Sequence, residues 1–202
     1  MRAIFLRLIK AAVFVAAAMP LCVLAYDVFF GPLAANPYPP ALRATGLWSL
    51  RFLLAVLALS PLARVAGWSW PLALRRMIGL YAAFYAFVHL AIWAKDYGFA
   101  WGFLGREILL RFFLTIGTAA VILLLPLTAT SFDAARRALG ARAWHFVHWL
   151  VYPAAAAAYI HFMLAGRLTR AETVIDGAIL AGLLLWRLAG SWRRWRPPAR
   201  VY

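Results

Sequence analysis

The chain has 202 residues, of which 66% are hydrophobic and only 13% are charged. A soluble domain carries about 25% charged and about 45–50% apolar residues, so this composition excludes an ordinary soluble domain and predicts an integral membrane protein. The net charge of +15 does not indicate nucleic-acid binding, because the basic residues cluster between apolar stretches, where membrane topology and anionic lipid account for them.

Six apolar stretches are long enough to cross a membrane, which takes about 20 residues of helix. They cover residues 9–30, 46–66, 75–95, 108–128, 143–166 and 173–191. The first follows Arg2, Arg7 and Lys10 and so resembles a signal peptide, but its length and the five later spans favour a retained helix. The expected fold is all-α: a polytopic membrane helical bundle with six transmembrane helices, forming a single integral membrane domain over residues 1–202.

Segments rich in proline and glycine separate these spans, first at residues 31–40 and again at 67–71. The glycine-rich and aromatic segment from Gly98 to Gly105 is expected to break the chain before the fourth span. A short amphipathic basic segment is expected after Ser131.

The basic residues are distributed unevenly between the two sides of this six-span topology. The side of the termini carries Arg2, Arg7, Lys10, Arg64, Arg75, Arg76, Arg136, Arg137, Arg142, Arg193, Arg194, Arg196 and Arg200, and the other side carries Arg43, Lys95, Arg106, Arg167 and Arg170. Because cytoplasmic loops are enriched in Lys and Arg, thirteen against five predicts that both termini are cytoplasmic. The first, third and fifth spans then run outward.

Two histidines lie deep within outward-running spans at matching positions. His89 precedes Lys95 by six residues and His161 precedes Arg167 by six, so the two imidazoles are expected at one depth near the outer face. Ionisable residues inside a bilayer are costly and therefore indicate function. Two neutral imidazoles facing each other are the axial ligands of a b-type haem, so the spacing predicts a haem held by His89 and His161.

Mostly small side chains precede both histidines on the same helix face. They are Ala86, Tyr85 and Ala82 before His89, and Ala158, Ala157 and Ala154 before His161. Such a strip lets a flat macrocycle lie close to each helix. Alanine strips also permit tight helix packing, and a membrane histidine can serve as a hydrogen-bonding link between helices, so packing is the alternative interpretation.

A third histidine, His148, lies thirteen residues before His161, about 20 Å along an ideal helix. It is expected near the inner face and predicts a second haem or another redox site, although arginines occupy the matching level of the third span. Pro153 can kink the helix between the two histidines. His145, one turn before His148, is interpreted as an interfacial residue.

Arg51 and Arg111 lie in the second and fourth spans, toward the outer face. Because arginine pairs well with carboxylates at low dielectric, both are candidates for binding haem propionates, and the alternative is that they snorkel to the interface. Arg187, near the inner end of the sixth span, is interpreted as a snorkelling residue. The acidic residues fall in or near loops and Cys22 is the only cysteine, so catalysis by side chains alone is not expected.

Several segments, in order along most of the chain, match a known family. They are Ala35-Asn36-Pro37, the run from Thr45 to Leu54, Ser60-Pro61-Leu62, the run from Arg75 through Tyr85 to His89, the run from Pro126 to Ser131, and the run from Trp144 to Tyr152, ending at His161. The chain thereby resembles the MsrQ (YedZ) family, haem-binding membrane subunits of bacterial periplasmic methionine sulfoxide reductase systems with a ferric-reductase-like transmembrane domain. Trp149 stands where that family tends to have arginine.

The resemblance implies a multi-pass protein of the bacterial inner membrane whose haem ligands carry over to His89, His148 and His161. It implies one or two b haems and an association with FMN. Electrons would come from the quinone pool or a cytoplasmic flavin donor. They would pass to a periplasmic molybdenum-cofactor reductase, MsrP, which reduces methionine sulfoxide in oxidised periplasmic proteins.

On this interpretation the chain is an electron-transfer subunit of an oxidoreductase complex rather than a self-sufficient enzyme, since few residues follow the last span. The alternative is a diheme quinol-linked cytochrome b, or a ferric-reductase-like protein that serves another periplasmic acceptor. A third interpretation is a membrane transporter or assembly factor without a cofactor. Partner docking is expected at the outer loops, residues 96–107 and 167–172.

Overall fold

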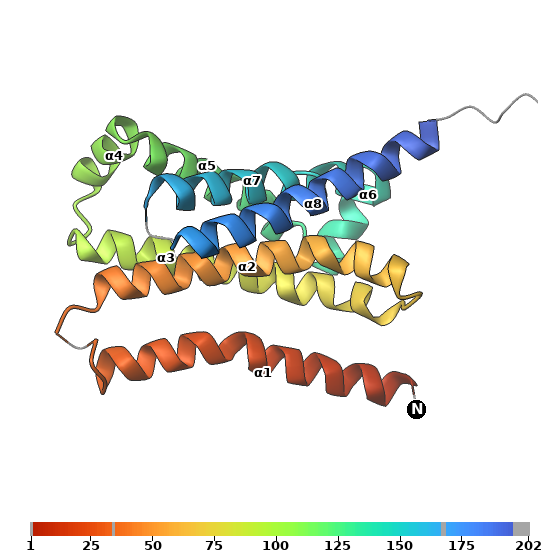
Figure 1. Ribbon diagram of the computed structural model, residues 1–202, viewed down its shortest axis with the longest axis horizontal. Helices are drawn as coiled ribbons and strands as arrows, with labels where there is room; N and C mark the ends of the chain where they lie inside the picture. Colours follow the sequence, from red (N-terminus) through yellow and green to blue (C-terminus); the bar gives the residue numbers. More distant parts are fainter. Residues whose placement is uncertain (1, 34, 167–168, 196–202) are drawn as a thin grey trace, which may run out of the picture.

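The computed structural model describes residues 2–33, 35–166 and 169–195, and over these residues the chain is a bundle of helices without strands (Figure 1). The helices are α1 (Arg2–Phe29), α2 (Tyr38–Val65), α3 (Arg75–Asp96), α4 (Trp101–Leu110), α5 (Phe112–Ala129), α6 (Asp133–His148), α7 (Val151–Leu164) and α8 (Arg170–Trp195). A short 3-10 helix, η1 (Trp70–Leu74), leads directly into α3. The expected all-α fold is confirmed.

Five helical stretches of the described residues are long and apolar enough to cross a membrane. They are Ile4–Phe29, Tyr38–Val65, Trp70–Asp96, Phe112–Ala129 and Asp133–Leu164. These stretches cover the first five predicted spans, and the chain is an integral membrane protein. α8 covers the sixth predicted span, 173–191, and carries Asp176 and Arg187 within it.

The fourth span begins later than predicted. Within the predicted break over 98–105, left-handed backbone occurs only at Gly98 (φ 59°) and Phe99 (φ 57°), so the break is shorter than expected and α4 already begins at Trp101. α4 ends before Arg111, whose backbone is extended with φ −110° and ψ 105°, and α5 begins directly after it. Arg111 therefore lies at a junction between two helices and not within a span.

The predicted fifth span, 143–166, is two helices rather than one. α6 ends at His148, and α7 starts after a short turn. Pro153 explains the break, because proline lacks an N–H and its ring clashes with the carbonyl four residues earlier, here that of Trp149. His148 and His161 stand on different helices, so the separation of about 20 Å expected along one straight helix does not apply.

The interior forms where α2 packs against α3 and α5 packs against α7, with α8 against α2 and α7. Figure 1 shows these five helices running alongside one another, with α1 at the edge. The buried core comprises Leu47, Leu50, Leu53, Leu54, Leu57, Ala82, Ala86, Leu124, Ala154, Ala155, Phe162 and Leu180. Leucines of α2 thus meet alanines of α3 and α7, and this close van der Waals packing is the main force that holds helices together in lipid.

α1 is peripheral, with only 6% of its most apolar stretch buried in the bundle. Tyr85 of α3 ties it to the core: the tyrosine hydroxyl accepts a hydrogen bond from the Leu21 backbone N–H at 3.1 Å and donates to the Ala17 carbonyl at 2.8 Å. The hydroxyl thereby inserts between two backbone groups of α1 that would otherwise bond to each other. It does so next to Pro20, whose missing N–H already interrupts the backbone hydrogen bonds of this helix. The Tyr85 side chain therefore points to α1, and Tyr85 is not part of the strip of small side chains expected beside His89.

Candidate functional site

His89 of α3 and His161 of α7 face each other inside the bundle. Their ring centroids are 6.2 Å apart and their ring planes meet at 85°. A metal–imidazole bond is about 2.0 Å long and the ring centre lies about 1 Å beyond it, so two imidazoles on opposite sides of one metal have centroids about 6 Å apart. The two rings therefore lie next to each other, at a separation that fits two imidazoles on one metal.

Each ring is held at its Nδ1 atom by a backbone carbonyl. Nδ1 of His89 lies 3.0 Å from the carbonyl oxygen of Leu42 in α2, and Nδ1 of His161 lies 2.7 Å from that of Phe113 in α5. A carbonyl only accepts hydrogen bonds, so Nδ1 carries the proton in both rings and Nε2 carries the lone pair. Metal-binding histidines use this arrangement because the second hydrogen bond sets both ring orientation and tautomer.

Thr45 supports the same tautomer at His89. Its hydroxyl donates to the Ala41 carbonyl at 2.7 Å, and its oxygen lies 3.4 Å from Nδ1 of His89. Because the threonine proton is used in the first bond, the oxygen faces the imidazole as an acceptor. Thr45 is fully buried, so this contact is shielded from solvent.

Two glycines make room for the rings. A Cβ atom at Gly117 of α5 would lie 2.6 Å from Nδ1 and 2.8 Å from Cε1 of His161. A Cβ atom at Gly46 of α2 would lie 3.0 Å from Nδ1 of His89 and 2.6 Å from Cζ of Phe162. Because close-packed interiors do not tolerate such distances, any other residue would push the neighbouring ring away.

Four of the five alanines predicted beside the histidines lie in the bundle interior. Ala82 and Ala154 are fully buried, and Ala86 and Ala158 belong to the same core or pack against it. Small side chains at these positions bring α3 close to α2 and α7 close to α5. That closeness places each imidazole beside the carbonyl group that holds it.

The donor set fits a b-type haem. Within residues 2–33, 35–166 and 169–195, no three or more His, Cys, Asp or Glu side chains gather in a way that could hold a bare metal ion. A porphyrin brings four nitrogens of its own, so its iron needs only two axial ligands from the protein. His89 and His161, opposed and hydrogen-bonded through Nδ1, meet that requirement.

His148 has different surroundings. Its ring stacks on the indole of Trp144 with a centroid distance of 3.8 Å, and its Nδ1 lies 3.1 Å from the Trp144 carbonyl. The indole Nε1 donates to the Thr130 carbonyl at 2.9 Å, which anchors the stack at the end of α5. In the described part of the chain the ring facing His148 is an indole, so the structure pairs no second histidine ring with it.

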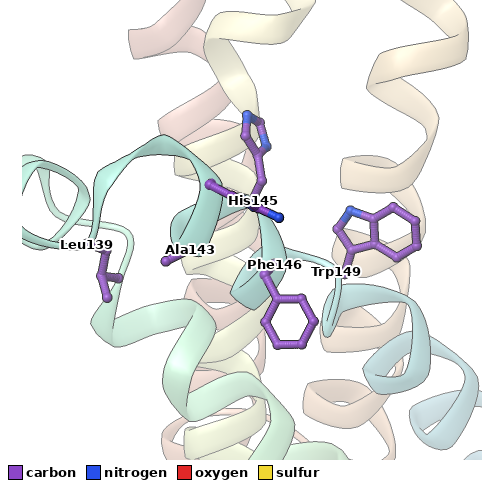
Figure 2. A pocket seen from close by; sticks show the side chains of 6 residues that line it. Leu139, Ala143, His145, Phe146 and Trp149 are labelled. Atoms are coloured by element: carbon purple, nitrogen blue, oxygen red, sulfur yellow. The ribbon is translucent and has the colours of Figure 1, made fainter.

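His145 lines a shallow pocket on α6, shown in Figure 2. The other lining residues are Leu139, Arg142, Ala143, Phe146 and Trp149. His145 and Phe146 point to opposite sides of the helix, and Phe146 and Trp149 are 80% and 68% exposed. Exposed aromatic residues beside an arginine are typical of a membrane interface, which agrees with the interfacial interpretation of His145.

Both arginines predicted to bind propionates have carboxylate partners. Arg51 lies 3.6 Å from Glu172, and its guanidinium carbon lies 5.8 Å from the ring centroid of Trp48. Arg111 pairs at 2.5 Å with Glu107, one turn earlier. The role of Arg51 and Arg111 with haem propionates therefore stays a prediction.

The interpretation of Arg187 as a snorkelling residue did not include its contacts with two other helices. Its guanidinium turns inward and donates to the Ser60 hydroxyl at 2.7 Å and to the Tyr152 hydroxyl. The reason is tertiary: α8 packs on both α2 and α7, and these helices supply acceptors that the sequence around Arg187 does not reveal.

One carboxylate joins α8 to α2 at the end of α2 that carries Thr45. Thr169 and Glu172 form a capping box: the Thr169 N–H donates to the Glu172 carboxylate at 3.0 Å, and the Glu172 N–H donates to the Thr169 hydroxyl at 3.2 Å. The same carboxylate pairs with Arg43 at 2.5 Å. Glu172 thus stabilises both the start of α8 and its attachment to the bundle.

We expect this junction to weaken in acid. The backbone N–H of Thr169, then its hydroxyl and Arg43, hold the pKa of Glu172 below its ordinary value of 4.5, against the opposing effect of burial. A group with a depressed folded pKa stabilises the fold above its unfolded pKa, and that contribution is lost as the pH falls from about 4.5 through the folded pKa. Thermal unfolding of the detergent-solubilised protein across this range should show a decline that is reduced in Glu172→Gln. Equal declines in the wild type and Glu172→Gln would contradict the assignment.

The sequence analysis did not predict the carbonyl groups and glycines that contact the rings of His89 and His161. The carbonyls of Leu42 and Phe113 leave no signal, because every residue supplies a carbonyl. Gly46 and Gly117 did leave one: glycine within a helix costs about 1 kcal/mol relative to alanine, so its presence marks a close approach between groups. Those two positions could have been predicted to face a bulky neighbour.

Fold and site together define a ferric-reductase-like membrane bundle, in which histidines on two helices lie with their ring centroids 6.2 Å apart. A family model described as ferric reductase like transmembrane component matches residues 45–159, more than half of the chain. The match includes His89 and His148 and ends two residues before His161.

The chain belongs to the MsrQ family within this class. It is 42% identical to the heme-binding subunit MsrQ of protein-methionine-sulfoxide reductase from Rhodospirillum rubrum, with 94% of this chain and 92% of the relative covered. Subunits of the same name from Herminiimonas arsenicoxydans and Polaromonas naphthalenivorans are 39% and 40% identical, covering 94% and 93% of this chain and 88% and 87% of the relatives. The predicted family membership is confirmed.

Proposed function

We propose that this chain is a b-haem electron-transfer subunit that delivers electrons to a periplasmic methionine sulfoxide reductase and so serves the repair of oxidised periplasmic proteins. The observation that carries the proposal is the opposed pair His89 and His161, each with Nδ1 on a backbone carbonyl. The relatives' name, heme-binding subunit of protein-methionine-sulfoxide reductase, supports both the cofactor and the system served. Haem bound between these residues would let single electrons enter and leave the protein.

The proposed location is the bacterial inner membrane, with both termini cytoplasmic and the histidine pair toward the periplasm. The excess of basic residues on the side of the termini supports this orientation. Three of the counted residues, Arg167, Arg196 and Arg200, lie outside the described part of the chain. The donor would be the quinone pool or a cytoplasmic flavin reductase, and the acceptor a molybdopterin-dependent reductase of the MsrP kind.

The chain's own residues would set the properties of this site. Hydrogen bonds from Nδ1 of His89 and His161 to carbonyls make the imidazoles more basic, which stabilises a more positively charged metal. The buried leucines and alanines of the core exclude water, which favours the less charged state. The balance between these opposing effects would determine the reduction potential of the site.

His148 is proposed as a ligand toward the cytoplasmic end, for a second haem b. Its half-buried ring, stacked on Trp144, is held at Nδ1 as the other two histidines are, which leaves Nε2 as the basic nitrogen. FMN is the other candidate cofactor, on the family resemblance alone. A diheme quinol-linked cytochrome b that serves a different acceptor is the second candidate function.

The loops 96–107 and 167–172 are proposed to dock the periplasmic partner. The first includes the beginning of α4, where Trp101 is 69% and Phe103 46% exposed. Large exposed aromatic side chains of this kind are enriched at protein interfaces. Residues 167–168 of the second loop lie outside the described residues.

A spectrum followed by reoxidation tests the proposed function. The detergent-purified protein is expected to show a b-type spectrum, and protein reduced with limiting dithionite should be reoxidised by an MsrP-like reductase supplied with methionine sulfoxide. Reoxidation by a ferric chelate but not by that reductase would favour the other acceptor. A colourless protein, after expression with ample haem supply, would contradict the proposal. It would favour a transporter or assembly factor in which the histidines serve packing or proton relay.

A further inference from the structure

A second polar cluster lies at the other end of the bundle from the histidine pair. It consists of Ser60 on α2, Arg75 at the start of α3, Tyr152 on α7 and Arg187 on α8. His89 follows Arg75 by fourteen residues, about 21 Å along α3. The cluster is therefore separate from the histidine pair.

Two guanidinium groups converge on one hydroxyl in this cluster. Nη2 of Arg75 donates to Oγ of Ser60 at 2.5 Å, and Nη2 of Arg187 donates to the same oxygen at 2.7 Å. Arg187 also donates to the carbonyl of Leu57 at 3.3 Å and to the hydroxyl of Tyr152. The shared acceptor holds two positive charges side by side.

No carboxylate of the described residues neutralises this pair of cations. All six acidic residues of the chain are among those described, and the ion pairs they form are Arg43 and Arg51 with Glu172, Arg76 with Asp133, and Arg111 with Glu107. Like charges repel, and the repulsion grows where burial lowers the dielectric. A converging arginine pair without a carboxylate therefore forms a site that attracts an anion.

We infer that the cluster of Ser60, Arg75, Tyr152 and Arg187 binds a phosphate group. Arginine presents a planar fork of N–H donors that matches phosphate oxygens, and the two hydroxyls add further donors. These groups come from four different helices, α2, α3, α7 and α8. Two guanidinium groups and two hydroxyls offer more donors than the two oxygens of a carboxylate can accept, so this donor set favours phosphate.

The cluster is open to ligands from the bundle surface, because Arg75 is exposed and Arg187 is only half-buried. Two sources of phosphate fit this position. One is the head group of an anionic phospholipid, which basic pockets between membrane helices bind on the cytoplasmic side. The other is a water-soluble phosphate monoester. Both present the same chemistry to the arginines.

Phosphate-dependent stabilisation tests the inference. The full-length protein, stripped of lipid in an uncharged detergent, is titrated with inorganic phosphate while thermal unfolding is followed by tryptophan fluorescence. Tm should rise with phosphate and not with acetate at the same ionic strength, because a bound ligand stabilises the folded state. Arg75→Gln and Arg187→Gln should each weaken the apparent phosphate affinity about tenfold or more, the effect of losing a charged hydrogen bond.

Matched variants separate binding from folding. Arg76→Gln removes the neighbouring charge, whose partner is Asp133, and should leave the phosphate response intact. Arg187→Lys keeps the charge but loses the fork, so it should bind phosphate with intermediate affinity. If Arg187→Gln does not fold, Arg187→Lys and Ser60→Ala supply the comparison, since both replace only part of the site.

Micelles doped with phosphatidylglycerol or with an uncharged glycolipid distinguish the two sources. Stabilisation by phosphatidylglycerol that abolishes the response to inorganic phosphate identifies a lipid head group as the ligand. A phosphate response that persists in phosphatidylglycerol identifies a soluble phosphate monoester. A wild type that responds to neither, or arginine variants that respond as the wild type does, would overturn the inference.

Discussion

Replacing His161 or His89 by alanine is expected to abolish haem binding at the histidine pair, and with it the contribution of that haem to the b-type spectrum of the purified protein. In the proposed site each imidazole would supply one of the two protein ligands of the haem iron, and the remaining ring would not hold the haem by itself. The loss of haem affinity should exceed the roughly 10–100-fold that accompanies removal of an outer-shell partner of a metal ligand. The measurement is the reduced-minus-oxidised visible spectrum per mole of protein, recorded for each variant beside the wild type.

His145→Ala is the matched control for the two alanine variants. His145 is exposed and lines the shallow pocket on α6, so its removal should leave the spectrum at the histidine pair unchanged. The haem content of His148→Ala is a separate measurement, because loss of only part of the haem would indicate a second haem site. Retention of the full spectrum in both His89→Ala and His161→Ala would rule out this pair as the ligands.

Gly117→Ala is expected to disturb the site without removing a ligand. The new Cβ would lie 2.6 Å from Nδ1 of His161, so the ring must turn or shift and its 2.7 Å bond to the Phe113 carbonyl must lengthen. Overpacking of this kind costs about 1–3 kcal/mol, and loss of an orienting hydrogen bond costs roughly 10–100-fold in metal affinity. We therefore expect weaker haem retention, a changed low-spin electron paramagnetic resonance signal and a shifted midpoint potential.

Gly79→Ala is the control for Gly117→Ala, because both introduce one methyl group into a membrane helix. At Gly79 the nearest group to a new Cβ is Cγ2 of Val56 at 3.8 Å, an ordinary contact, so spectrum and potential should stay as in the wild type. Gly46→Ala should behave like Gly117→Ala, acting on His89. If Gly117→Ala and Gly79→Ala have the same resonance signal and potential, Gly117 does not position the ring.

The prediction that succeeded best rests on local properties of the chain. Hydropathy, helix-breaking residues and charge bias act within short segments, and together they place His89 and His161 at equal depths before any packing is known. The structure then brings the two rings to 6.2 Å. The break at Pro153 also had a local cause, since proline disrupts a helix wherever it stands. A kink between His148 and His161 was expected there, but not the division of the span into two helices.

Only the tertiary structure decided the contacts between segments that lie far apart in the chain. The sequence by itself determined a membrane bundle, its main spans and the histidines that meet within it. It did not determine that Leu42 and Phe113 supply the carbonyls, or that Arg187 turns toward Ser60. A backbone carbonyl looks the same in every residue, and a long side chain takes its direction from the partners that neighbouring helices offer. Those partners exist only once α2 has packed against α3 and α8, and α5 against α7.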